Sequence, residues 1–151
     1  MPPSADVLPV LRVDVTMNKT TGDLVRGAAF HEAGHVIVAQ YLGLPAADIK
    51  INDDGSGYSQ IGPSGHLPLI DQVALCVAGI EAQELFECKT VPLAAAADYT
   101  KVVSLVNGLT EAESLEIRSA GYLRALAILK SRQLELEELA HYLIEHRHVS
   151  R

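Results

Sequence analysis

The chain has 151 residues, near the usual size of one domain, and 48% of them are hydrophobic, which is enough to build a core. A net charge of −7 argues against a nucleic-acid partner. No run reaches the roughly 18 apolar residues that a membrane span needs, and residues 1–6 lack the basic and apolar regions of a signal peptide. We therefore expect a cytoplasmic protein without a membrane span.

The chain is expected to divide into an N-terminal arm, residues 1–20, and a single domain, residues 21–151. Within the arm, Val13 and Val15 alternate with polar residues. Alternation of this kind is typical of a strand, so a short edge strand and an arm without much structure are both consistent with the pattern. The sequence shows no internal repeat and no second domain.

Residues 20–42 are predicted to form a helix, because a threonine at its start can cap it and Gly43 can end it. This helix carries the pattern His-Glu-x-x-His at His31, Glu32 and His35. Positions i and i+4 of a helix share one face, so both histidines can present a ring nitrogen to one metal ion. Glu32 can reach a water on that metal without being a ligand. Two imidazoles, a water and a carboxylate are the arrangement found in zinc hydrolases.

The same pattern could also be two surface histidines on an amphipathic helix. Its flanking residues favour burial instead, because they are all apolar. A buried His-Glu-His face without a metal would leave polar groups unpaired, at a cost of roughly 1–3 kcal/mol each. The sequence therefore favours a metal site over a solvated helix face. The flanking residues are Ala28, Ala29, Phe30, Val36, Ile37 and Val38.

Residues 47–52 and 58–61 are predicted to pair as a β-hairpin, because residues 53–57 between them are rich in Asp, Gly and Ser. A strand in this place can hold an extended peptide by main-chain hydrogen bonds. After a loop at residues 62–68 the chain is predicted to be helical. The expected fold class is mainly α, with one small hairpin after the His-Glu-x-x-His helix. The four later helices are expected near residues 69–87, 94–106, 110–130 and 133–145, with a capping box at Thr110 and Glu113.

The two cysteines, Cys76 and Cys88, are predicted to lie on one helix, where twelve residues at 1.5 Å each separate them by about 18 Å. This distance is too large for a disulfide. We interpret both as free core residues, which suits a reducing compartment.

Two histidines do not complete a zinc site, and a third protein ligand is needed. The metzincin pattern would require glycine and histidine where this chain has Val38 and Tyr41. The third ligand must therefore come from later in the chain. Asp98 can also be interpreted as an acidic residue in the first turn of a helix, where the helix dipole favours it. His66 can be interpreted as a solvated loop residue. The candidates are Glu81, Glu84, Glu87, Asp98 and His66.

Four segments carry motifs in an order that points to a known family. Residues 31–35 read His-Glu-Ala-Gly-His and precede a Gly-Tyr hairpin. Residues 77–85 are similar to a Gly-Gly-Arg-x-Ala-Glu-Glu motif, and residues 94–99 to a Gly-Ala-x-Asn-Asp-Leu segment. The C-terminal helices, from residues 127–145, complete the set. Over roughly residues 20–146 the chain thus resembles the peptidase domain of the FtsH-type ATP-dependent zinc proteases.

In that family the aspartate of the third segment is a zinc ligand. The resemblance therefore implies that His31, His35 and Asp98 bind Zn²⁺ and that Glu32 is the general base of a metallopeptidase. We interpret Glu84 as a residue that orients a ligand histidine, and it is the next candidate for the third ligand. The chain departs from the family at Ile80, Gln83 and Ala97, where the family has Arg, Glu and Asn.

The sequence contains no Gly-x-x-x-x-Gly-Lys-Ser/Thr phosphate loop, so the family's ATPase module is missing from it. We expect a free-standing zinc endopeptidase that cuts peptides and unfolded or flexible protein segments without ATP, any unfolding being left to a separate ATPase partner. Because the family works as closed rings, we expect a homo-oligomer. Two alternatives are a short regulatory protease that acts on one specific protein and a non-catalytic scaffold or binding protein that keeps the fold.

Overall fold

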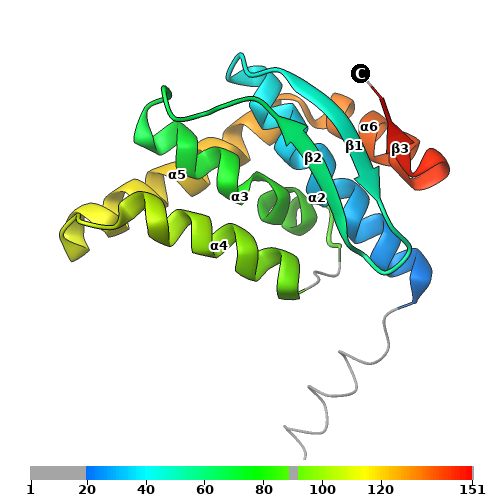
Figure 1. The fold of residues 1–151 in the computed structure, drawn as a ribbon, viewed down its shortest axis with the longest axis horizontal. Helices are drawn as coiled ribbons and strands as arrows, with labels where there is room; N and C mark the ends of the chain where they lie inside the picture. The colour runs from blue at the N-terminus through cyan, green and yellow to red at the C-terminus, as the bar shows by residue number, and fades with distance from the viewer. Residues whose placement is uncertain (1–19, 89–91, 151) are drawn as a thin grey trace, which may run out of the picture.

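A computed structural model describes residues 20–88 and 92–150 and shows a mainly helical fold with one small antiparallel sheet (Figure 1). The expected fold class is confirmed. The N-terminal arm, with its candidate strand at Val13 and Val15, lies outside the described residues except for Thr20. The elements are α2 (Thr21–Tyr41), β1 (Ala46–Ile51), β2 (Gly57–Ile61), α3 (Leu69–Leu85), α4 (Pro92–Val106), α5 (Glu111–Ser131), α6 (Gln133–His146) and β3 (His148–Val149).

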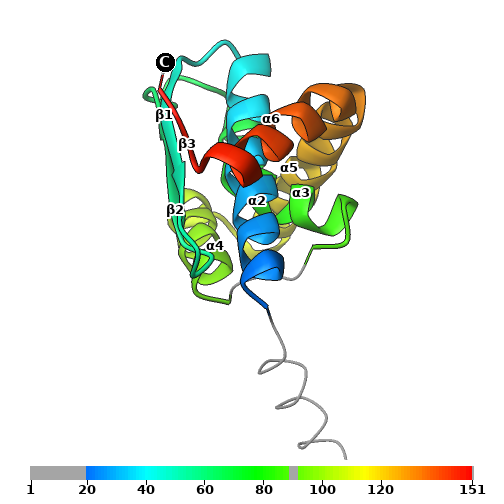
Figure 2. The ribbon, with the colours of Figure 1, turned by 90° about the vertical axis from the view of Figure 1, so that its right-hand side faces the viewer.

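Helix α2 runs through the middle of the molecule, between the sheet on one side and α3, α5 and α6 on the other (Figure 2). A capping box starts it: the Thr20 hydroxyl accepts a hydrogen bond from the Asp23 backbone N–H, and the Asp23 carboxylate accepts one from the Thr20 N–H. Gly43, with a φ of 80°, follows its end. Every residue from Gly27 to Ala39 is buried. Polar side chains in this stretch therefore face the protein interior and must find partners there.

The sheet has the order β2-β1-β3, and both pairings are antiparallel. The predicted hairpin of β1 and β2 is confirmed, and its turn uses Gly55 at a φ of 88°. The two-residue strand β3 was not predicted. It is added to β1 after Arg147, whose guanidinium pairs with Asp53 in the hairpin turn at 3.1 Å. This order leaves β2 with an unpaired edge in the described sheet.

Small residues let α2 and α3 approach closely. A Cβ on Gly34 would lie 2.6 Å from the Ala78 carbonyl oxygen and 2.7 Å from the Ala82 Cβ. Helix α4 packs on α3 and α5, and its Ala97 lines a cavity beside the site. The close helix contact is therefore between α2 and α3.

The remaining helices close the core as the sequence predicted. The capping box of Thr110 and Glu113 at the start of α5 is confirmed. Both cysteines are free, but the prediction that they share a helix was wrong, because α3 ends at Leu85 and Cys88 lies beyond it. None of the helices in the described ranges is both long and apolar enough to cross a membrane.

Candidate metal centre

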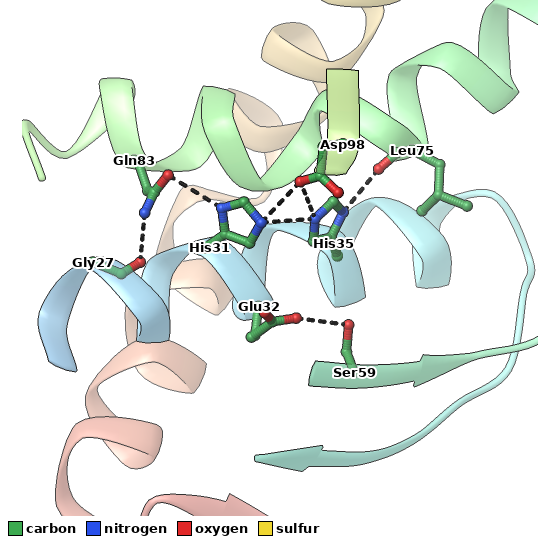
Figure 3. A network of polar contacts seen from close by, with 8 residues as sticks. All are labelled: Gly27, His31, Glu32, His35, Ser59, Leu75, Gln83 and Asp98. Carbon is green, nitrogen blue, oxygen red and sulfur yellow. Dashed lines mark hydrogen bonds and ion pairs between the residues drawn. The ribbon is translucent and has the colours of Figure 1, made fainter. Parts of the chain in front are cut away.

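The two histidines of α2 and one aspartate of α4 meet in the interior (Figure 3). The Asp98 Oδ2 atom lies 2.9 Å from His31 Nε2 and 3.1 Å from His35 Nε2, and the two Nε2 atoms are 3.2 Å apart. The three residues are between 5% and 9% exposed. Helical spacing brings the histidines to one face of α2. The packing of α4 on α3 supplies an aspartate 63 residues further on.

A glycine of α3 makes room for this cluster. A Cβ on Gly79 would lie 2.7 Å from His31 Cδ2, His31 Nε2 and His35 Nε2. Real Cβ atoms do not approach other heavy atoms this closely, so any side chain here would displace the rings. Gly79 therefore packs directly against the two histidine rings.

The second nitrogen of each ring fixes its protonation. His35 Nδ1 lies 2.9 Å from the backbone carbonyl oxygen of Leu75, which can only accept a hydrogen bond. Nδ1 therefore carries the proton and donates it to that oxygen. In the neutral ring, Nε2 is then left with a lone pair, and this lone pair faces the cluster.

Gln83 does the same for His31. Its Nε2 donates to the Gly27 carbonyl oxygen at 2.9 Å, which turns its Oε1 toward His31 Nδ1 at 3.1 Å. An amide oxygen only accepts, so the His31 Nδ1–H donates to it. His31 Nε2 also keeps a lone pair toward Asp98. A partner of this kind behind the ring is the usual companion of a metal-binding histidine.

When both rings are neutral, three hydrogen-bond acceptors thus converge in one buried place. They are satisfied either by a proton on one of the rings, which then donates to Asp98, or by a metal cation. Ligands at 2.0–2.1 Å from a tetrahedral zinc ion are about 3.3 Å from one another. The three separations of 2.9 to 3.2 Å are close to this value. Two imidazole nitrogens and a carboxylate oxygen are also a donor set that suits a transition metal. His31, His35 and Asp98 therefore fit a metal ion.

The charges of the cluster are set by its contacts. Burial acts to raise the pKa of Asp98, but hydrogen bonds and charge interactions with both histidines outweigh it and hold that pKa well below the usual range. Burial acts to lower the pKa of His31, yet Asp98, Glu32 and Gln83 together raise that pKa above its ordinary value. Asp98 is consequently an anion at neutral pH, and the cluster attracts positive charge.

Glu32 lies next to the cluster on α2 but is not part of it. Its carboxylate Oε1 accepts a hydrogen bond from the Ser59 hydroxyl of β2 at 3.0 Å (Figure 3). A Cβ on Gly57 would lie 3.3 Å from Glu32 Cγ, so the bare backbone of β2 leaves space for this side chain. Strand β2 therefore both borders and positions Glu32.

An open cavity of about 430 Å³ gives access to the cluster. His31, Glu32, His35 and Asp98 face it from the helices, and residues 57–59 face it from β2. The candidate ligands and the candidate base thus share one solvent-accessible space. An extended molecule along the edge of β2 could reach all of them.

Of the five candidates for the third ligand, only Asp98 joins the histidines in the described structure. Glu84, Glu87 and His66 are exposed, and Glu81 forms no part of the cluster. The prediction that Glu84 orients a ligand histidine was wrong: its neighbour Gln83 does so. The signal was present, because Gln83 stands at the position where the resembling family has a glutamate.

A comparison of the sequence with models of known protein families finds no match, and a comparison with curated proteins finds no relative. The case for a function consequently depends on the geometry of the cluster and its cavity.

Proposed function

We propose that this protein is a zinc-dependent endopeptidase. The observation that carries the proposal is the position of Glu32 beside a buried cluster of three metal-directed acceptors, in a cavity bordered by β2, whose outer edge pairs with no other strand of the described residues. A metal site that serves only structure is usually closed by four protein ligands, whereas a catalytic zinc site has three and leaves a position for water. The described residues around His31, His35 and Asp98 offer three.

The proposed metal is zinc. Two imidazoles and one carboxylate in tetrahedral spacing are common ligands of zinc hydrolases. When bound, the ion would lower the pKa of a water to about 7 and polarise the carbonyl group of a substrate. Asp98 would contribute the one anionic ligand, and the hydrogen bonds from the Nδ1 atoms would keep both rings in the metal-binding tautomer.

In this proposal Glu32 moves the proton. Its carboxylate accepts a proton from the attacking water and then gives it to the leaving amine of the cleaved peptide bond. The Ser59 hydroxyl holds one carboxylate oxygen, and the side chain lines the cavity. Glu32 is 8% exposed, and the cavity that it lines gives it access to water and substrate.

The edge of β2 would hold the substrate. Its main-chain N–H and C=O groups can pair with an extended peptide in the manner of an added strand. Such binding requires a chain without secondary structure of its own. Peptides, flexible tails and unfolded proteins are therefore the proposed substrates, and both a separate unfoldase and a homo-oligomer stay predictions.

The test compares the wild-type protein with Glu32→Gln, both loaded with zinc, on an unfolded protein and on a mixed peptide library. We expect cleavage by the wild type and a loss of roughly 10²–10⁴-fold in rate for Glu32→Gln, with zinc content and helical circular dichroism unchanged. If Glu32→Gln loses its zinc, Glu32 is a ligand and the proposed mechanism fails. If zinc-loaded wild type cuts neither substrate, the endopeptidase proposal fails and a binding or scaffold role is the better account.

A further inference from the structure

The cavity beside the metal centre is lined by a lysine that forms no ion pair with a carboxylate in the part of the chain that the structure describes. Lys101 lies on α4, one helical turn after Asp98, and lines the cavity with the cluster residues. Its side chain is exposed. Within residues 20–88 and 92–150, no ion pair joins Lys101 to an Asp or Glu. Its ammonium group is therefore available to a molecule that enters the cavity.

Lys101 also lines a second cavity of about 390 Å³. Ser64, Cys76 and Lys101 border both cavities, so the two adjoin at this lysine. Lys101 lies close enough to Cys76 to act on its charge. Burial raises the pKa of the Cys76 thiol, and the positive charge of Lys101 opposes that rise. A substrate that extends from the metal centre into the second cavity must pass the ammonium group.

The second cavity suits an anionic group. No acidic side chain lines it among the described residues, and Ser64 and Ser104 add hydroxyl donors. The acids of the first cavity are already engaged, Asp98 by both histidines and Glu32 by Ser59. Lys101 is thus a local positive charge on a chain whose net charge is −7. It attracts anionic groups, which the net charge of the protein disfavours elsewhere.

We propose that Lys101 binds a carboxylate of the substrate and so selects chains with an acidic group near the bond to be cut. The inference rests on the proposed peptidase function, which it extends to substrate choice. Two sources supply this chemistry, the side chain of Asp or Glu and the carboxyl terminus of a peptide. A lysine binds either as a point charge, so the experiment must separate them.

Binding is measured first, on zinc-loaded Glu32→Gln protein so that the peptides stay intact. One set of amidated peptides carries a single glutamate at each position in turn, a second replaces it by glutamine, and a third carries glutamine and a free carboxyl terminus. We expect one of the two carboxylate-bearing sets to include peptides that bind about fivefold more tightly than the amidated glutamine peptides. Tighter binding in the first set identifies an acidic side chain as the group that Lys101 binds, and tighter binding in the third set identifies the carboxyl terminus.

The advantage should disappear when Lys101→Met is added, reverse to a penalty with Lys101→Glu, and persist with Lys130→Met. Lys130 is an exposed lysine in the last turn of α5 that lines none of the cavities described, and methionine preserves helix propensity at both sites. If all three peptide sets bind equally, or fail to bind, the inference is overturned. It is also overturned if the advantage survives in Lys101→Met.

Cleavage of the same peptides by protein with Glu32 intact separates this inference from the proposed function. Cleavage without any preference for a carboxylate would leave the peptidase proposal standing and refute the role of Lys101. Carboxylate-dependent binding without cleavage of any peptide would support the role of Lys101 as an anion-binding residue and refute the peptidase proposal.

Discussion

The side chain of Gln83 connects the ring of His31 to the backbone of the helix that carries it. Its amide oxygen accepts from His31 Nδ1 at 3.1 Å, while its amide nitrogen donates to the Gly27 carbonyl oxygen at 2.9 Å. Gln83 is 2% exposed. Both ends of the amide are therefore held, and the lone pair of His31 Nε2 is fixed toward Asp98.

Replacing Gln83 should weaken metal binding without removing a ligand. For Gln83→Leu we expect zinc affinity to fall by about 10- to 100-fold, as is typical when the partner behind a ligand histidine is lost. Gln83→Glu separates the two hydrogen bonds, because its carboxylate still accepts from His31 Nδ1 but cannot donate to the Gly27 carbonyl oxygen. Competition for zinc with a coloured chelator measures both variants. Equal affinity of Gln83→Leu and wild type would mean that the Gln83 bridge does not orient the ligand.

The close contact between Gly79 and the two histidine rings predicts that a single added methyl group disturbs the site. Gly79→Ala places a Cβ about 2.7 Å from both rings, so we expect at least tenfold weaker zinc binding, a less stable fold by about 1–3 kcal/mol, or both. Gly65→Ala is the control, since a Cβ there meets nothing within 4 Å. Zinc titration and denaturant unfolding report the two effects. A Gly79→Ala protein that matches wild type in both would contradict this account of the site.

The pKa shifts of His31 and Asp98 predict how the metal-free fold responds to pH. The raised pKa of His31 stabilises the fold fully below the unfolded value of 6.5 and loses this effect as the pH rises through the folded pKa. The lowered pKa of Asp98 stabilises the fold above the unfolded value of 3.8 and loses this effect as the pH falls further. Metal-free protein should therefore be most stable between about pH 4 and 6.5.

Zinc should stabilise the fold more as the pH rises, which is opposite to the pH dependence of the metal-free protein, because the histidines must be unprotonated to bind zinc. We expect the rise in melting temperature on adding zinc to grow between about pH 5.5 and 8. In Asp98→Asn the metal-free protein should lose most of its pH dependence in this range, since the partner of His31 is no longer charged. Thermal unfolding with and without zinc across this range checks both statements. A zinc effect that shrinks as the pH rises would contradict them.

Local patterns in the sequence predicted the parts of the fold that depend on neighbours in the chain. The spacing of His31 and His35, the capping box at Thr110 and the hairpin all follow from residues within a few positions of one another. Strand β3 could not be predicted in this way, because its two residues are too few to show a periodicity and pair with β1 only in the folded chain. Local reasoning is strongest where the structure itself is local.

The third ligand lay beyond such reasoning. Asp98 is 63 residues from His35, and the residues alone left five candidates open until the family resemblance favoured one. The error at Glu84 has a helical cause. One residue along a helix turns a side chain by about 100°, and this step separates exposed Glu84 from buried Gln83. The motif position indicated a role in the site, but only the packing of α3 on α2 shows which side chain reaches His31.

The same contrast gives a test of the ligand set. Asp98→Ala should lower zinc affinity by more than 100-fold, because it removes a ligand rather than the partner of one. Glu84→Gln should leave zinc binding unchanged, since Glu84 is exposed and outside the cluster. Zinc titration of the two proteins, with circular dichroism as a check on folding, decides the matter. If Glu84→Gln lost zinc and Asp98→Ala kept it, Glu84 would be the ligand, and the position of α4 at the site would be wrong.

The central claim is that His31, His35 and Asp98 form a zinc site, and metal analysis of the purified protein tests it most directly. Protein prepared without added metal, and protein dialysed against zinc at neutral pH, are measured by mass spectrometry of the elements. We predict about one zinc per chain, as expected for one set of three ligands, and none in Asp98→Ala treated in the same way. Wild-type protein that contains no zinc and takes up none on dialysis would contradict the claim.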